Sequence, residues 1–411
     1  MSGRVTFAGL LGGMLMLTFL ALYGPGGQYA PYLAMGLEVI AIPYVLIVRN
    51  GRPLQPDPAA LAFVVAFLLI TAAYWFASSK PSDVLIVANF GWLLLFAPLQ
   101  SLMKRLAAPN AAVTIARLAL IGVAATLGWA IYERLQFDVT RVGRLSSDPI
   151  RIANTAVILG FLSLTGLRAE RGRLRLLYLA GPLLAVGVAV LAETRGAIVS
   201  SCILALLCTA LLVRRKGLAL LIALGLAVVA SVALLVAARL HVARVDTLIR
   251  SIQQLLSGEA VSNTSAKTRL AMLQAAWSAF LDSPWYGHGW QRMMKSIIRY
   301  LPEGQETLTR GQPHLHNDIA DFGVSAGVMG LVAYVTIILT PLLVAWRSVR
   351  DSLYRARLFG VTVLVACYAV LGLNALMFGY EVHTALYCGL VAILLGFCRE
   401  NNPFAVRSVP A

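Results

Sequence analysis

The sequence predicts an all-α protein that crosses a membrane about twelve times. Of its 411 residues, 59% are hydrophobic and only 13% are charged, and the mean hydropathy is +0.79. Soluble domains carry about 25% charged residues, so this chain is too apolar to face water on all sides. The apolar residues also fall in runs of about 20, the length that a helix needs to cross a bilayer. One long polar segment, 239–318, interrupts this pattern.

Twelve apolar runs define the expected spans. They are 5–23, 29–48, 59–77, 83–101, 110–132, 149–167, 174–192, 196–213, 217–238, 319–346, 358–379 and 383–398. Arg4 precedes the first run and no small-residue cleavage site follows it, so we expect a span there rather than a removed signal peptide. Three parts result: nine spans in 1–238, a polar helical loop in 239–318, and three spans with a cytoplasmic tail in 319–411.

The basic residues alternate from loop to loop. One set of loops contains Arg49, Arg52, Lys104, Arg105, Arg168, Arg171, Arg173, Arg175, Arg214, Arg215, Lys216, Arg347, Arg350, Arg355 and Arg357. The short loops 24–28, 78–82 and 380–382 contain a single basic residue, Lys80. The positive-inside rule therefore predicts that both termini are cytoplasmic. It also explains the net charge of +16 by membrane topology rather than by nucleic-acid binding.

This orientation places three segments on the outer side of the membrane. They are the loop 133–148, the turn Glu193-Thr194-Arg195-Gly196 and the polar loop 239–318. The polar loop has apolar residues at helical spacing in 242–256, and a second stripe formed by Leu270, Leu273, Trp277 and Phe280. Asp282-Ser283-Pro284 ends this second helix, and Tyr286-Gly287-His288-Gly289 is typical of a turn. A further helix is expected to begin near His316 and to continue into the tenth span.

Positive charge on the outer side runs against the usual tendency and suggests an anionic substrate. Arg195 lies at a membrane boundary, where burying an unpaired guanidinium is costly; a salt bridge to Glu193 or snorkelling is the structural alternative. Arg269 opens a loop helix, where a solvated basic face is the alternative. Other candidate substrate-binding residues on this side are Arg141, Arg144, Arg292, Arg310 and Lys80.

Two histidines close together end the polar loop. His314 and His316 flank Leu315, and Asn317 follows. Two His at this spacing form half a metal site, but no Cys, Asp or Glu constellation completes it, so we expect no metal. A general base fits better, because His titrates near neutral pH and can take a proton from a hydroxyl. The amides of a helix beginning here would also favour an anion. The five Cys lie in or beside apolar runs without CxxC spacing, and are expected to be core residues.

Three short motifs lie in order between the seventh and tenth spans. The first is Thr194-Arg195-Gly196-Ala197, similar to a Ser/Thr-Arg-Gly motif that opens a span. The second is Thr268-Arg269-Leu270, then Trp277, then Pro284-Trp285-Tyr286-Gly287-His288-Gly289. The third is Pro313-His314-Leu315-His316-Asn317, then Gly323 and Gly327. Together they resemble the O-antigen ligase family, within the wider O-antigen ligase and polymerase superfamily.

The resemblance implies a GT-C-like glycosyltransferase of the bacterial inner membrane. Such a ligase transfers a glycan from undecaprenyl diphosphate to a sugar hydroxyl of the lipid A core at the periplasmic face, completing lipopolysaccharide. By position, His316 would be the general base, and Arg195 and Arg269 would bind the diphosphate. His314 and Asn317 would contact substrate, although the family pattern does not require a His at 314. The leaving diphosphate needs charge stabilisation more than a proton, so no cofactor is expected, and single displacement predicts inversion.

Other functions stay open on the sequence alone. An O-antigen polymerase and a protein O-oligosaccharyltransferase would share the donor chemistry and differ in the acceptor. A lipid-linked glycan transporter would need charged or broken helices at the membrane midplane, where only Glu38 and Arg117 lie well inside expected spans. The short segment after the twelfth span favours the ligase.

Overall fold

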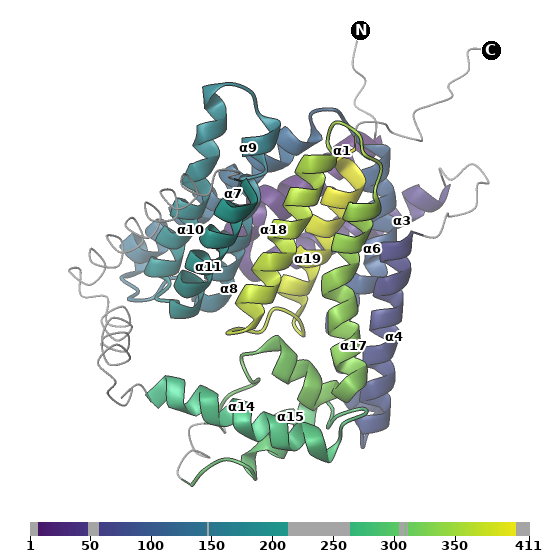
Figure 1. Cartoon of the computed structure of the whole chain (residues 1–411), viewed down its shortest axis with the longest axis vertical. Coiled ribbons are helices and arrows are strands. Elements are labelled where there is room, and N and C mark those ends of the chain that lie inside the picture. The colour runs from purple at the N-terminus through teal and green to yellow at the C-terminus, as the bar shows by residue number, and fades with distance from the viewer. Residues whose placement is uncertain are drawn as a thin grey trace.

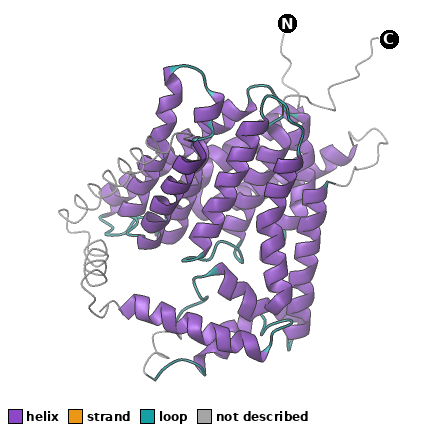
Figure 2. Ribbon diagram, in the orientation of Figure 1, coloured by secondary structure: helices purple, strands orange, loops and turns teal. Residues whose placement is uncertain are grey.

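The structure, a computed structural model, describes residues 7–47, 57–145, 148–212, 264–303, 309 and 311–399. This part of the chain consists of helices and loops and contains no strand, in agreement with the all-α prediction (Figure 2). Nine of its segments are long and apolar enough to cross a membrane. The expected span 217–238 and the helix expected at 242–256 lie outside the described residues, so a total of twelve spans stays a prediction.

The helices follow the expected spans closely. In chain order they are α1 (Phe7–Leu17), α2 (Tyr23–Gly26), α3 (Ala30–Ile47), α4 (Pro58–Ala77), α5 (Pro81–Val84), α6 (Trp92–Arg105), α7 (Ala111–Phe137), α8 (Pro149–Ser163), α9 (Gly166–Ala169), α10 (Ala180–Leu191), α11 (Arg195–Leu212), α14 (Thr264–Asp282), α15 (Trp290–Ile298), α17 (Asp318–Arg347), α18 (Tyr354–Gly372) and α19 (Glu381–Ala392). Short 3₁₀ or π-helical turns extend several of them, including η1 (Thr18–Leu22) and η5 (Ile393–Phe397).

The first apolar segment forms two spans rather than one long helix. The ring of Phe7 at the start of α1 lies 5.4 Å from the ring of Tyr44 near the end of α3. The chain must therefore reverse between them, and it does so at Gly27, where φ is 53°. This arrangement agrees with the two expected spans 5–23 and 29–48.

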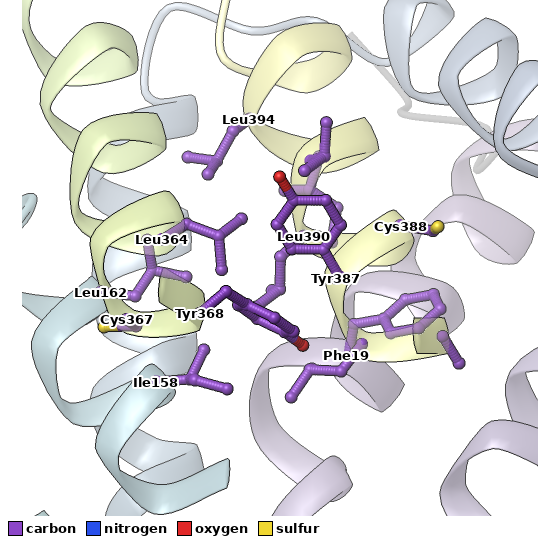
Figure 3. Packing of buried hydrophobic residues seen from close by; sticks show 14 of the residues in the cluster. Phe19, Ile158, Leu162, Leu364, Cys367, Tyr368, Tyr387, Cys388, Leu390 and Leu394 are labelled. Atoms are coloured by element: carbon purple, nitrogen blue, oxygen red, sulfur yellow. The ribbon is translucent and has the colours of Figure 1, made fainter. Parts of the chain in front are cut away.

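The core of the bundle lies where α8, α18, α19 and η1 meet (Figure 3). The rings of Tyr368 and Tyr387 lie 4.6 Å apart, and both side chains are fully buried. Each hydroxyl donates to a carbonyl, Tyr368 to His383 at 2.7 Å and Tyr387 to Ile337 at 2.8 Å. These bonds satisfy polar groups that hydrocarbon could not. Four of the five cysteines are buried as expected, whereas Cys202 is exposed.

Helices α14 and α15 lie together across one end of the bundle, opposite the end that contains α9 (Figure 1). We call this the α14–α15 end. Helix α14 ends at Asp282, as expected. Its apolar stripe is exposed, since Trp277 is 63% accessible, and its buried face consists of small residues such as Ala275 and Ala279. Helix α15 occupies a stretch for which the sequence predicted no element.

The turn after α14 packs directly on α17. His288 N donates to Val324 O at 2.8 Å, and Gly289 N donates to Ser325 O at 2.9 Å. Gly287 and Gly327 both have positive φ, 69° and 61°, and Gly327 interrupts the helical geometry of α17. A β-carbon on Gly287 would lie 2.5 Å from the Ser325 carbonyl carbon, and one on Gly327 would lie 2.6 Å from Pro284 O. The second and third motifs therefore contact each other through the backbones of Gly287 and Gly327. A side chain at either position would push the two segments apart.

Candidate active site

The turn between α18 and α19 brings all three motifs together. Arg269 Nη1 of the second motif donates to the carbonyl of Asn374 at 3.4 Å. Asn317 Nδ2 of the third motif donates to the carbonyl of Leu373 at 3.1 Å. Gly196 of the first motif lies so close to Asn374 Oδ1 that a β-carbon there would collide with it. Residues far apart in the sequence thus converge on two neighbouring residues, Leu373 and Asn374.

Arg195 and Arg269 are both half-buried at this convergence. Arg195 is the first residue of α11, and the preceding turn is held from two sides. Thr194 Oγ1 donates to Pro149 O at 3.2 Å, and Arg141 Nε donates to Ala192 O at 2.9 Å. The turn therefore presents Arg195 from an ordered backbone at the α14–α15 end of the bundle.

The two histidines of the third motif contact each other. Their ring centroids are 4.2 Å apart, and the backbone N–H of His316 donates to His314 Nδ1 at 3.1 Å. Because His314 Nδ1 accepts a hydrogen bond, a neutral His314 must carry its proton on Nε2. This contact occurs where His316 adopts a left-handed conformation, with φ of 57°. Such a conformation is uncommon for a residue with a side chain and is often found at functional sites.

The hydrogen bond of His316 determines which ring nitrogen can act as a base. His316 Nε2 lies 3.0 Å from Gln312 Oε1. A carbonyl oxygen only accepts, so Nε2 must donate its proton to it, and the lone pair is then on Nδ1. Nδ1 is buried and has no hydrogen-bond partner among the described residues. A buried acceptor without a partner is costly unless a substrate group supplies a donor.

Burial and neighbouring charge keep both histidines neutral. Burial, and then the positive charge of Arg269, lower the pKa of His316 to about 4, although Asp148 opposes them. Burial lowers the pKa of His314 to about 3, with further contributions from His316, Arg151 and Arg269. Both rings therefore offer an unprotonated nitrogen at neutral pH. Arg269 and Asn317, the residue after His316, donate to the neighbouring carbonyls of Asn374 and Leu373, which brings the Arg269 charge to the side of the site that carries the histidines.

The sequence did not point to several residues of this site. Arg151 lies 4.8 Å over the ring of Tyr380, and the ring of His314 is 6.1 Å from the same ring. Burial raises the pKa of the Tyr380 hydroxyl. Gln312 and Asn374 were missed too, since an isolated amide carries no distinctive pattern. Arg151 did carry a signal, because an arginine inside an expected span is costly and usually functional.

Two buried carboxyl groups hold the start of α17 in place. Asp318 Oδ1 accepts from Met377 N at 2.8 Å and Phe378 N at 3.3 Å. Asp321 Oδ1 accepts from Leu315 N at 2.8 Å, between the two histidines. Among the described residues, no group of three or more His, Cys, Asp and Glu is arranged to hold a metal ion. The bonds of Asp318 and Asp321 position the turns that carry the site.

The other residues predicted from the sequence lie at different places. Arg141 holds the turn before Arg195, and Arg144 is exposed on the same loop. Arg292 Nη1 donates to Ser79 Oγ at 2.8 Å, next to the exposed Lys80. Arg292 lines a separate groove between α15 and the end of α4, and Lys80 lies outside its lining. Arg310 lies outside the described residues.

A comparison with protein families finds a match to part of this chain. The family model described as O-antigen ligase matches residues 180–335, which include all three motifs. No curated protein matches the chain. The matched segment runs from α10 into α17 and covers Arg195, Arg269 and both histidines. Residues 180–335 of this chain are therefore similar to the O-antigen ligase family.

Proposed function

We propose that the protein is an O-antigen ligase that transfers a glycan from undecaprenyl diphosphate to a sugar hydroxyl of the lipid A core, at the periplasmic face of the inner membrane. One observation carries this proposal. The buried Nδ1 of His316 has no partner among the described residues and lies beside the positive charge of Arg269. A neutral base next to a cation suits attack by a hydroxyl with departure of an anion.

Arg195 and Arg269 are the proposed ligands of the donor diphosphate. Both are half-buried. Arg195 is the first residue of α11, an expected span, so a lipid-borne anion would reach it from the bilayer. Guanidinium groups donate paired hydrogen bonds to phosphate oxygens. The same contacts stabilise the diphosphate as it leaves, when its charge increases, so they contribute more in the transition state than in the bound donor.

His316 is the proposed general base. The acceptor hydroxyl gives its proton to Nδ1 while its oxygen forms a bond to the anomeric carbon. The bond from that carbon to the diphosphate oxygen breaks, and the electron pair leaves with the diphosphate. A single displacement inverts the anomeric carbon. Gln312 acts as a positioning residue that holds the proton on Nε2, and the Nε2–H of His314 is available to donate to substrate.

The alternatives differ from this proposal in measurable products. A polymerase would lengthen the lipid-linked glycan, and a protein O-oligosaccharyltransferase would modify a Ser or Thr. A transporter would move the donor across the membrane without breaking a bond. Of the two charges expected inside spans, Arg117 is paired with Glu170 at 2.8 Å, whereas Glu38 is buried in α3.

The first prediction tests the base with the purified protein, a lipid-linked glycan and rough lipopolysaccharide. His316→Ala should lower the transfer rate by about 10²- to 10⁴-fold, the usual contribution of a general base. Binding of the donor should change little, because the two arginines remain. His316→Asn is a second variant, since Asn adopts the left-handed conformation more readily and cannot act as a base.

His314→Ala is the comparison variant. It removes a proposed substrate contact but retains Nδ1 of His316, so it should lower the transfer rate less than His316→Ala does. If His316→Ala transfers glycan at the wild-type rate, the assignment of the base is wrong. If only His314→Ala abolishes transfer, His314 is the base. A longer lipid-linked glycan, in place of modified lipopolysaccharide, would identify a polymerase.

A further inference from the structure

A basic groove lies at the α14–α15 end, apart from the histidine site. It lies between the end of α4, the turn that follows α14, and helix α15, and has a volume of about 460 Å³. Its polar lining includes Arg292, Lys295, Arg299, Ser283 and Ser296. No acidic residue belongs to the lining. The hydroxyls of Ser283 and Ser296 donate to the carbonyls of Gly287 and Met293, and Arg299 pairs with Asp282. Arg292 and Lys295 are therefore the two cations that the groove offers to an anionic ligand.

The amphipathic character of α15 explains how these cations come together. Arg292, Lys295 and Arg299 follow one another at spacings of three and four residues, so they share a helix face. Met293 and Ile297 on another face are fully buried against α14. Arg299 pairs with Asp282 at the end of α14, whereas Lys295 is exposed. The packing of α15 therefore directs the positive face away from the protein interior.

Exposed aromatic rings border this groove. Trp75 and Phe76, at the end of the membrane-spanning α4, are 63% and 65% exposed. Trp285 and Tyr286, in the turn after α14, are 69% and 43% exposed, and the rings of Phe76 and Tyr286 lie 6.3 Å apart. Aromatic rings gather at the level of lipid headgroups. The groove is therefore at the height at which the headgroup of a membrane lipid would reach it.

Helix α15 connects the groove with the histidine site. Trp290, its first residue, lies 6.0 Å from the ring of Tyr380, and Tyr380 lies 6.1 Å from the ring of His314. A lipid whose headgroup occupied the groove would thus lie along a helix whose first residue is linked through Tyr380 to His314, and His314 contacts the proposed base, His316.

We infer that this groove binds the phosphate groups of the acceptor, a membrane-anchored phosphorylated glycolipid, an inference that rests on the proposed function. Phosphate oxygens match the guanidinium of Arg292 and the ammonium of Lys295, whereas the sugar part of a headgroup would leave these two cations without counter-charges. The donor diphosphate already has its own pair of arginines at the other site. The groove would thus hold the acceptor lipid while its sugar chain extends toward His316.

The test measures binding of lipid A and of its enzymatically dephosphorylated form to the full chain in nanodiscs. Wild type should bind the phosphorylated lipid roughly tenfold more tightly, as expected for two partly solvated charge pairs. Arg292→Gln/Lys295→Gln should abolish this preference, leave affinity for the dephosphorylated lipid unchanged, and raise KM for the phosphorylated acceptor. If the double variant misfolds, the single variant Lys295→Gln, at an exposed position, tests the same preference for the phosphorylated lipid.

Arg134→Gln is the matched control, since it removes one positive charge at the same end on α7, outside the groove. Equal affinity of wild type for both lipids, or an equal loss with Arg134→Gln, would overturn the inference. Binding is measured without turnover, so the two proposals can fail separately. If wild type shows the phosphate preference but transfers no glycan, the proposed function fails and the groove remains a site for a phosphorylated lipid.

Discussion

At the scale of single residues, His316 shows how backbone and hydrogen bonds select a chemical role. Its left-handed conformation costs roughly 1–3 kcal/mol for a residue with a side chain. In that conformation its N–H bonds to His314 Nδ1, and its ring bonds to Gln312 through Nε2. The remaining nitrogen is buried with its lone pair intact. Because hydrogen bonds already hold the ring in the tautomer that can accept a proton, no free energy is needed to reach that tautomer before the reaction.

The second prediction concerns the acidic limb of the pH profile. His316 acts as a base only when neutral, so kcat/KM should fall as the pH decreases through its pKa of about 4. Arg269 lowers this pKa, so Arg269→Gln should move the limb to higher pH. The limb should stay below pH 6.5, because burial is the larger cause of the shift. The rate at neutral pH should also fall by about a hundredfold, as for loss of one transition-state cation.

Lys267→Gln is the control for this experiment. It removes an exposed charge from the same helix, two residues earlier, and is not a cause of the histidine shifts. It should change neither the limb nor the rate. An unmoved limb in Arg269→Gln would show that the charge does not act on the base.

At the scale of elements, the site depends on contacts between turns and helix starts. Asp318 binds the backbone of the turn 373–380, which in turn accepts hydrogen bonds from Arg269 and Asn317. Gly287 and Gly327 allow the turn after α14 to lie against the interruption in α17. Helix α14 is therefore positioned by backbone contacts at its end, as well as by its buried alanine face.

The third prediction tests the contact between these two motifs. Gly327→Ala places a β-carbon at φ of 61° and 2.6 Å from Pro284 O, so we expect a loss of roughly 2 kcal/mol or more in stability. The midpoint of thermal unfolding in detergent should fall by several degrees, as for a change of this size. Gly323→Ala is the control, because a β-carbon there meets nothing closer than 3.7 Å and Ala favours the helix. Equal midpoints for the two variants would contradict this account.

At the scale of the whole molecule, the predicted orientation divides the bundle into two chemically different ends. The α14–α15 end contains the histidine site and the basic groove, both proposed to face the periplasm. The opposite end contains the loops with Arg171, Arg173 and Arg350, predicted to be cytoplasmic. A donor lipid in the outer leaflet could reach the site only with this orientation.

The fourth prediction is that membrane-impermeant maleimide labels the two ends differently in spheroplasts. Lys80→Cys lies at the α14–α15 end and Arg171→Cys at the other, and both positions are exposed. In a Cys202→Ser background, which removes the one exposed native thiol of the described chain, only Lys80→Cys should react before the membrane is opened. Labelling of Arg171→Cys alone would mean that the orientation is inverted.

Much of the fold could be predicted because the bilayer imposes it. A helix that crosses hydrocarbon needs an apolar run of set length, so 59–77, 149–167 and 319–346 correspond closely to α4, α8 and α17. The exposed stripe of α14 shows the limit of such patterns. Trp277 and Leu270 mark an apolar face, but hydropathy does not say whether that face meets protein, and here the alanine face is the buried one.

Sequence alone predicted the helical spans, of which those within the described residues are confirmed, together with a side of the membrane for each loop and three motifs with Arg195, Arg269 and His316. These follow from local composition and spacing. The folded chain was needed to see that the motifs meet at Leu373 and Asn374, that Gln312 selects the nitrogen of His316, and that α15 lines a basic groove with α4 and the turn after α14. The physical reason is that a hydrogen bond between residues 105 positions apart leaves no trace in the local pattern of either.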